Sequence, residues 1–116
     1  YIGSAFIATK EANAVQGYKD MIVESSGEDI VYSNLFTGVH GNYLKGSIRA
    51  QGMDPDNLPT SDPSKMSFAN AETKAWKHIW GCGQGIGAVT EVLPAADLVE
   101  RLAGEYAASK KRICAA

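Results

Sequence analysis

This chain has few cysteines and no long apolar run, and each of these features excludes some classes of protein. The 116 residues include only two cysteines, Cys82 and Cys114, whose spacing fits neither a zinc site nor a redox pair. We therefore expect reduced thiols, which favours the cytoplasm, and no metal site. No apolar run approaches the length of a membrane-spanning helix, so a membrane is not an expected partner.

The start of the sequence has no initiator methionine and no charged leader, and it opens inside an apolar run. One short strand with no partner close behind it is not stable alone. We therefore expect Tyr1 to lie in the middle of a longer polypeptide, with most of the fold encoded upstream.

Charge of one sign does not dominate either, because 11 basic residues stand against 13 acidic ones and the net charge is -2. The basic run Lys110-Lys111-Arg112 lies near the C-terminus, where positive charge suits the end of a helix. Since no basic patch or stripe stands out, nucleic acid is not an expected partner. The hydrophobic content of 45% is that of an ordinary globular chain.

The opening residues YIGSAFIATKE follow the order strand end, glycine, hydroxyl, helix start. Thr9 is the expected N-cap of a helix from Lys10 to Glu24, with Glu11 in its first turn. In α/β proteins this order builds anion sites. Gly3 lets a ligand approach the backbone, Ser4 adds a hydroxyl and helix N–H groups add positive potential. An ordinary turn is the alternative interpretation of Gly-Ser after an apolar run.

Short periodic segments alternate with turn-forming residues along the rest of the chain. We expect a strand at Asp29–Ser33, a loop at Asn34–Gly41, a helix from Asn42 to Gln51 that ends at Gly52, exposed turns at Asp54–Lys65, a helix at Ala71–Trp80 and a helix at Ala95–Arg112. In the last helix Leu98, Val99, Leu102 and Tyr106 share one face, which we expect to be buried.

Glycine occupies every second position from Gly81 to Gly87. This is not the dinucleotide-binding fingerprint, whose third glycine would stand where this chain has Ile86, and no lysine follows as in a P-loop. One interpretation is a backbone that lies flat against a large planar or anionic ligand, with Gln84 as a polar tip between Gly83 and Gly85. The equally weighted alternative is a flexible or tightly packed connector.

The chain as a whole resembles the C-terminal part of the nitronate monooxygenases, formerly called 2-nitropropane dioxygenases. The similarity runs in order through IGSAFIATKEA, YKDMIVESSGEDIVYSNLFTGVHGNYLKGSIR, DPDNLP and WKHIWGCGQGIGAV to the closing helix. The resemblance implies an α/β fold in which residues 1–116 form the C-terminal portion of a single FMN-binding TIM (β/α)8 barrel, mostly helical in this fragment. The upstream barrel would be missing.

The resemblance also implies which residues meet the cofactor FMN. Tyr1-Ile2 would be the end of the last barrel strand and Gly3-Ser4 its phosphate loop, with Gly83–Gly85 as a wall near the flavin ring. Many members carry Gly-Thr followed by arginine, whereas this chain has Ala5 after Ser4, so the basic side chain is absent. The family's catalytic histidine would lie upstream.

The implied activity is oxidation of alkyl nitronates with molecular oxygen. No catalytic role is therefore assigned to His40, expected as a backbone-bonded loop histidine, or to His78.

Two alternatives to nitronate oxidation stay open. The first is a related FMN-barrel enoyl-thioester reductase, which uses a similar phosphate loop. The second is a noncatalytic interaction module, in which Trp76, Trp80 and the apolar loop Leu35–Val39 form an exposed docking surface. A homo-oligomer is compatible with all three interpretations.

Overall fold

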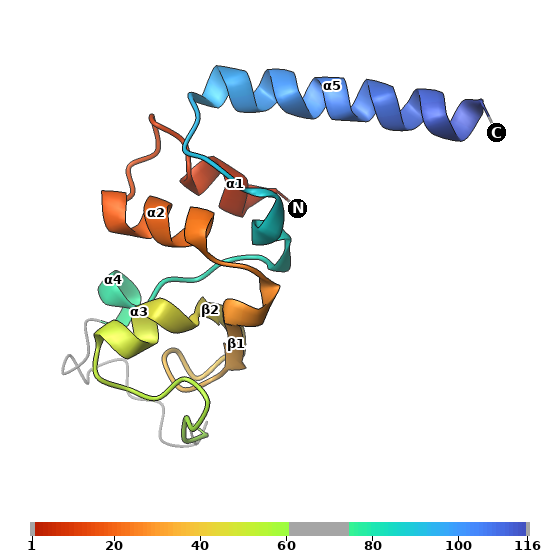
Figure 1. Cartoon of the computed structure of the whole chain (residues 1–116). Helices are drawn as coiled ribbons and strands as arrows, with labels where there is room; N and C mark the ends of the chain where they lie inside the picture. The colour runs from red at the N-terminus through yellow and green to blue at the C-terminus, as the bar shows by residue number, and fades with distance from the viewer. Residues whose placement is uncertain (1, 61–74, 116) are drawn as a thin grey trace.

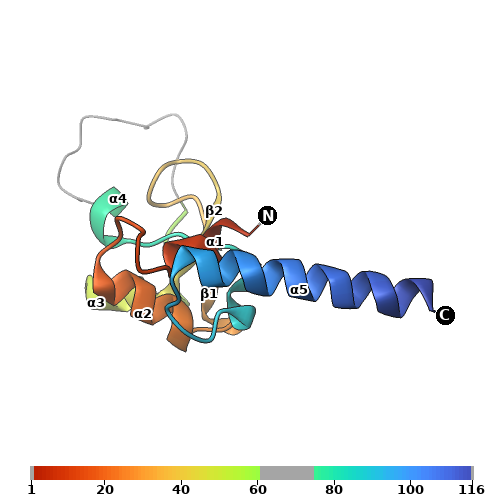
Figure 2. The same cartoon turned by 90° about the horizontal axis from the view of Figure 1, so that it is seen from above.

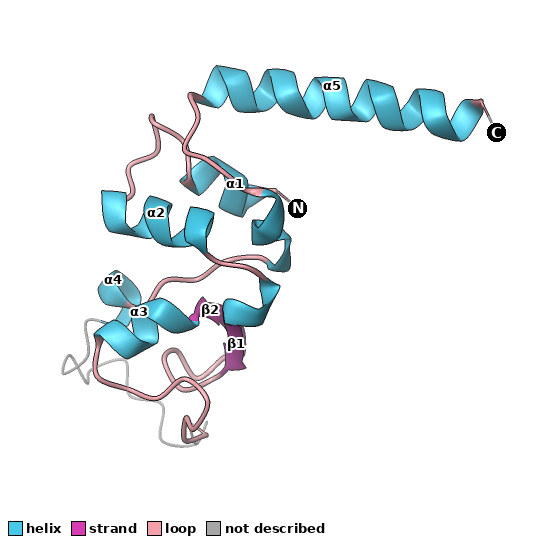
Figure 3. Cartoon of the chain, viewed as in Figure 1, coloured by secondary structure: helices cyan, strands magenta, loops and turns pink. Residues whose placement is uncertain are grey.

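The computed structural model describes residues 2–60 and 75–115 of a small, mostly helical α/β chain with one two-stranded sheet (Figure 1, Figure 3). Its elements in chain order are α1 (Gly3–Ile7), α2 (Gln16–Glu24), the 3-10 turn η1 (Gly27–Asp29), β1 (Ile30–Ser33), β2 (Gly41–Leu44), α3 (Lys45–Ala50), α4 (Ala75–His78), the 3-10 turn η3 (Gln84–Ala88) and α5 (Ala95–Cys114).

The segment before α2 differs from the prediction of one helix from Lys10 to Glu24. Thr9 is not an N-cap, because its buried hydroxyl donates to the carbonyl of Phe6 at 2.7 Å, in the last turns of α1. Thr9 forms a parallel β-bridge with Leu93, and the amide of Lys10 donates to the Leu93 carbonyl at 2.9 Å. This long-range pairing holds the segment out of the helix, so α2 begins only at Gln16.

The predicted strand at Asp29–Ser33 is confirmed at Ile30–Ser33. A capping box precedes it, in which the amide of Ser26 donates to the Asp29 carboxylate at 2.8 Å. The partner strand β2 was not predicted, because Gly41 was assigned to a loop and Asn42–Leu44 to the start of a helix. It pairs antiparallel with β1, from Ile30 opposite Leu44 to Ser33 opposite Gly41, so the following helix α3 begins only at Lys45.

Other boundaries follow the prediction closely. The chain leaves the α3 region through Gly52, whose φ of 81° is in the left-handed region that favours glycine. Turns and bends follow up to Thr60, while the predicted continuation at 61–65 and the helix start at 71–74 lie outside the described residues. The last helix α5 begins directly after Pro94 and extends two residues beyond the predicted end, to Cys114.

The core lies where α2, the hairpin and η3 meet. Its fully buried side chains are Ile22, Leu44 and Ile86, with Ala8 and Val89 beside them. Because Leu44 ends β2 and Ile86 lies inside the glycine-rich segment, this core fixes the glycine-rich segment against both the hairpin and α2.

Helix α5 lies mostly outside this core. Its first turns contact α1 and bury Leu98, but Val99 is 54% exposed and Tyr106 is 70% exposed. The predicted burial of these two residues is therefore wrong, because nothing in the described chain packs on that face. Figures 1 and 2 both show α5 extending away from the body. The radius of gyration is accordingly 16.9 Å, whereas a compact chain of this length would have about 13 Å.

Candidate functional site

The two segments that sequence reasoning assigned to a cofactor lie next to each other in space. The backbone amide of Gly83 donates a hydrogen bond to the hydroxyl oxygen of Ser4 at 2.7 Å, across 79 positions of sequence. A hydroxyl that accepts this bond still has its own proton to donate. Among residues 2–60 and 75–115, the Ser4 hydroxyl proton has no acceptor, so it is available to a ligand. We call Gly3, Ser4 and Gly83–Gly85 the Ser4–Gly83 junction.

The glycines of the junction are not required by packing inside the described chain. A Cβ added at Gly3 or Gly85 would meet no heavy atom within 4 Å, and neither residue has a positive φ. At Gly83 a Cβ would lie 3.4 Å from the Ser4 hydroxyl oxygen. Gly83, Gln84 and Gly85 are all exposed. The interpretation of this stretch as a tightly packed connector is therefore not supported at Gly85.

The chain just before the junction is anchored to the hairpin. The amide of Leu44 donates to the Trp80 carbonyl at 2.8 Å, and the amide of Cys82 donates to the Asn42 carbonyl at 3.2 Å. Gly81 forms an antiparallel bridge with Tyr43. On the other side Ile86 is fully buried. The exposed stretch from Gly83 to Gly85 is thus held at both ends and presented to solvent between them.

Tyr18 and Trp80 support this anchor from α2. Their rings stack with centroids 5.0 Å apart and planes 3° from parallel, and the Tyr18 hydroxyl donates to the Gly81 carbonyl. Burial raises the pKa of Cys82 to about 11, and burial together with the neighbouring Cys82 raises the pKa of Tyr18. The Cys82 thiol therefore keeps its proton at neutral pH and is not an activated nucleophile.

The predicted docking surface of an interaction module is only partly exposed. Trp80 is half-buried against Tyr18, and Phe36 packs edge-on against Tyr43 with centroids 5.0 Å apart. Val39 is 67% exposed. The side chain of Trp76 lies outside what the structure describes. Two of the residues offered for that surface are thus engaged within the chain.

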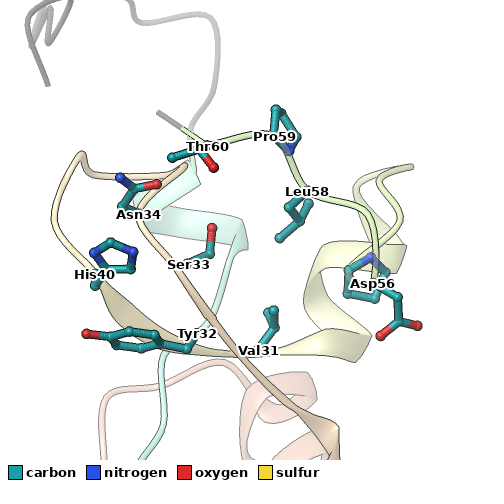
Figure 4. A pocket seen from close by; sticks show the side chains of 10 residues that line it. Val31, Tyr32, Ser33, Asn34, His40, Asp56, Leu58, Pro59 and Thr60 are labelled. Carbon is teal, nitrogen blue, oxygen red and sulfur yellow. The ribbon is translucent and has the colours of Figure 1, made fainter. Parts of the chain in front are cut away.

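His40 lines a separate pocket that sequence reasoning did not find. This pocket has a volume of about 210 Å³ and lies between the β1–β2 hairpin and the turns at 55–60 (Figure 4). The His40 ring stacks on Tyr32, with centroids 4.7 Å apart. Ser33 accepts the Leu35 amide at 3.1 Å, and Asp56 pairs with Lys45 at 3.1 Å. These polar groups are engaged with the chain itself, and none of the expected cofactor residues lines this pocket.

The remaining predicted residues are placed as follows. Tyr1 lies outside the described residues, and Ile2 is 52% exposed and belongs to no strand.

Within the described ranges, no three His, Cys, Asp or Glu side chains come together as metal ligands would. No helix among the same residues combines the length and apolar character needed to cross a bilayer. Comparisons with protein-family models, with curated proteins and with solved structures find no match to this chain.

Proposed function

We propose that this chain is the C-terminal part of an FMN-dependent oxidoreductase that oxidises alkyl nitronates with molecular oxygen. Its Ser4–Gly83 junction would contact the cofactor. The ordered resemblance along the whole sequence supports the family. The observation that carries the site is the hydrogen bond from the Gly83 amide to the Ser4 hydroxyl. This bond joins the two segments that the resemblance assigned to the phosphate and to the ring of the flavin.

The residues of the junction are suited to bind a phosphate group, but only with modest affinity. The Ser4 hydroxyl can donate while it accepts from Gly83, and the open space at Gly3 leaves its backbone accessible. The helix α1 has only five residues, and Ala5 supplies no positive charge. We therefore propose that phosphate binding relies on hydrogen bonds from this chain together with loops of the upstream barrel.

In the proposed barrel the hairpin lies outside the cylinder. TIM-barrel strands are parallel, whereas β1 and β2 are antiparallel and joined by a short loop. The last barrel strand would end at Ile2, whose backbone finds its partners in the upstream chain. Residues 9–93 would then form an excursion whose ends are held together by the bridge between Thr9 and Leu93.

In this proposal the cofactor supplies the redox chemistry, and the residues of this chain bind and orient the cofactor. When bound, FMN supplies the redox chemistry, taking electrons from the nitronate and delivering them to oxygen. The residues of this chain orient the cofactor, and none of them is proposed to move a proton in the reaction. The family's catalytic histidine is expected upstream, so His40 and His78 are left without a catalytic role.

The test uses the full-length protein that contains this chain. We expect it to purify yellow with bound FMN and to consume oxygen when an alkyl nitronate is added. Ser4→Ala should weaken FMN binding by about fivefold, because the lost hydrogen bond is worth on the order of 1 kcal/mol. Ser109→Ala, the same change on the distant helix α5, is the control.

Two other outcomes would each decide against the proposal. A colourless protein would favour the interaction module. A yellow protein that consumes NAD(P)H with an enoyl thioester, and takes up no oxygen with a nitronate, would favour the reductase.

A further inference from the structure

The pocket beside His40 has no part in the proposed function, since none of its described lining residues belongs to the Ser4–Gly83 junction. Its volume is about 210 Å³. A cavity of about 150 Å³ already holds benzene, so this pocket has room for a molecule of about six to ten non-hydrogen atoms. Sites for drug-sized ligands are larger, at about 300–1,000 Å³. The pocket therefore fits a small molecule.

Ser33 supplies a hydrogen-bond donor inside the pocket. The residue is only 8% exposed, and its hydroxyl oxygen accepts the Leu35 amide at 3.1 Å. Among residues 2–60 and 75–115, no group accepts the hydroxyl proton. Figure 4 shows this hydroxyl pointing into the open space between the hairpin and the turns at 55–60. Because a buried donor without an acceptor is unfavourable, a ligand oxygen placed here would be stabilised.

Apolar side chains line the pocket as well. Leu58 is half-buried and points into the same space from the turns (Figure 4). Pro55, from the same turns, is buried, and Val31 is half-buried on the hairpin. A short alkyl chain that lies against these residues would be removed from water, which is favourable.

The carboxylate in the pocket already has a partner. Asp56 is the one acidic residue among the described lining residues, and its carboxylate lies 3.1 Å from the ammonium of Lys45. No lysine or arginine occurs among the same lining residues. Since a charged ligand would lose hydration without meeting an unpaired opposite charge, the pocket favours an uncharged ligand.

We propose that this pocket binds a small uncharged organic molecule that carries a carbonyl oxygen and a short alkyl chain. The carbonyl oxygen accepts a hydrogen bond from the Ser33 hydroxyl, and the alkyl chain lies against Leu58 and Pro55. Butyramide has this chemistry and is small enough to enter. The proposal does not depend on flavin binding, because it uses only residues of the hairpin and of the turns at 55–60.

A chemical-shift titration of this chain tests the proposal. Butyramide should bind saturably with a millimolar dissociation constant, as expected for so few atoms, and should shift the amide signals of the lining residues. Butyrate and butylammonium, which are similar in size but charged, should not saturate in the same range. Absence of a saturable shift with butyramide, or tighter binding of either charged analogue, would overturn the proposal.

Two variants test whether butyramide occupies this pocket. Leu58→Trp fills the space and should abolish binding, whereas Leu102→Trp, the same change at a half-buried leucine of α5, should leave binding unchanged. Ser33→Ala should weaken binding about fivefold, since it removes one hydrogen bond, and Ser109→Ala is its control.

The first variant decides the question even if the loop after Ser33 rearranges without its hydroxyl, because Leu58 is outside the hydrophobic core. Butyramide binding that survives Leu58→Trp undiminished would lie elsewhere on the chain and would overturn the proposal.

Discussion

At the scale of single residues, a few side chains join segments that are far apart in the sequence. The buried hydroxyl of Ser47 donates to the Leu44 carbonyl at 2.8 Å and accepts the Trp80 amide at 3.0 Å. The carboxylate of Glu11 accepts the Ala95 amide at 2.8 Å, at the start of α5. Glu11 was expected near a helix N-terminus, and it lies at one, but the helix belongs to the other end of the chain.

The thiols of Cys82 and Cys114 should differ in reactivity because of their pKa values as well as their exposure. Burial raises the pKa of Cys82 from 9.0 to about 11, whereas Cys114 is exposed. We expect Cys114→Ser, which leaves only Cys82, to react far more slowly with a disulfide reagent at pH 8 than Cys82→Ser does. The pH profile of the slow variant should rise with a midpoint near 11. Equal rates for the two variants would contradict this assignment.

The raised pKa of Cys82 also makes the stability of the folded chain depend on pH in the alkaline range. The folded chain holds the Cys82 proton more tightly than the unfolded chain does, so this contribution to stability is fully present below pH 9 and is lost as pH rises towards 11. The urea midpoint of the wild type should therefore fall more steeply over this interval than that of Cys82→Ser.

At the scale of elements, glycine stabilises a helix end where φ is positive and destabilises the interior of a helix. Gly52 follows α3 with a φ of 81°, which a residue with a Cβ adopts at a cost of about 1–2 kcal/mol. Gly104 lies inside α5, and a Cβ there would meet no heavy atom within 4 Å. We expect Gly52→Ala to lower the free energy of unfolding by about 1 kcal/mol or more, and Gly104→Ala to raise the stability of its helix by up to about 1 kcal/mol.

The two glycine variants control for each other, because both add one methyl group to an exposed glycine. Urea denaturation followed by circular dichroism measures both. A neutral Gly52→Ala would mean that the chain relaxes at the end of α3 without strain.

At the scale of the whole molecule, the hydrophobic core is small and much of the chain is exposed to solvent. The elements around Ile22, Leu44 and Ile86 form one packed unit, while most of α5 and the Ser4–Gly83 junction are exposed to solvent. A junction supported from one side only has few groups with which to enclose a ligand. Its functional form, in our proposal, includes the upstream barrel.

We therefore expect the isolated 116-residue chain to bind FMN weakly or not at all. Isothermal titration measures this directly, and the full-length protein is the positive control. Tight binding, in the sub-micromolar range, would show that the junction suffices without further strand–helix units and would remove the barrel from the proposal.

Local sequence patterns determined the elements whose stability is local. The strand that ends at Ser33, the helix that follows Pro94 and the helix end at Gly52 were predicted from sequence. Strand formers, a fixed proline φ and a left-handed glycine act on their immediate neighbours. The segments at Gly3-Ser4 and Gly83–Gly85, which we propose contact FMN, were also singled out from sequence, by their glycine and hydroxyl pattern and by the resemblance.

Tertiary structure alone decided where distant segments compete for the same backbone. Pairing with Leu93 kept Thr9 from capping a helix and Lys10 from starting one, and pairing with β1 took Asn42–Leu44 out of another. The contact between Ser4 and Gly83 and the exposure of Tyr106 likewise depend on which segments meet. Local propensities differ by only about 1 kcal/mol, so a few long-range hydrogen bonds and buried side chains outweigh them.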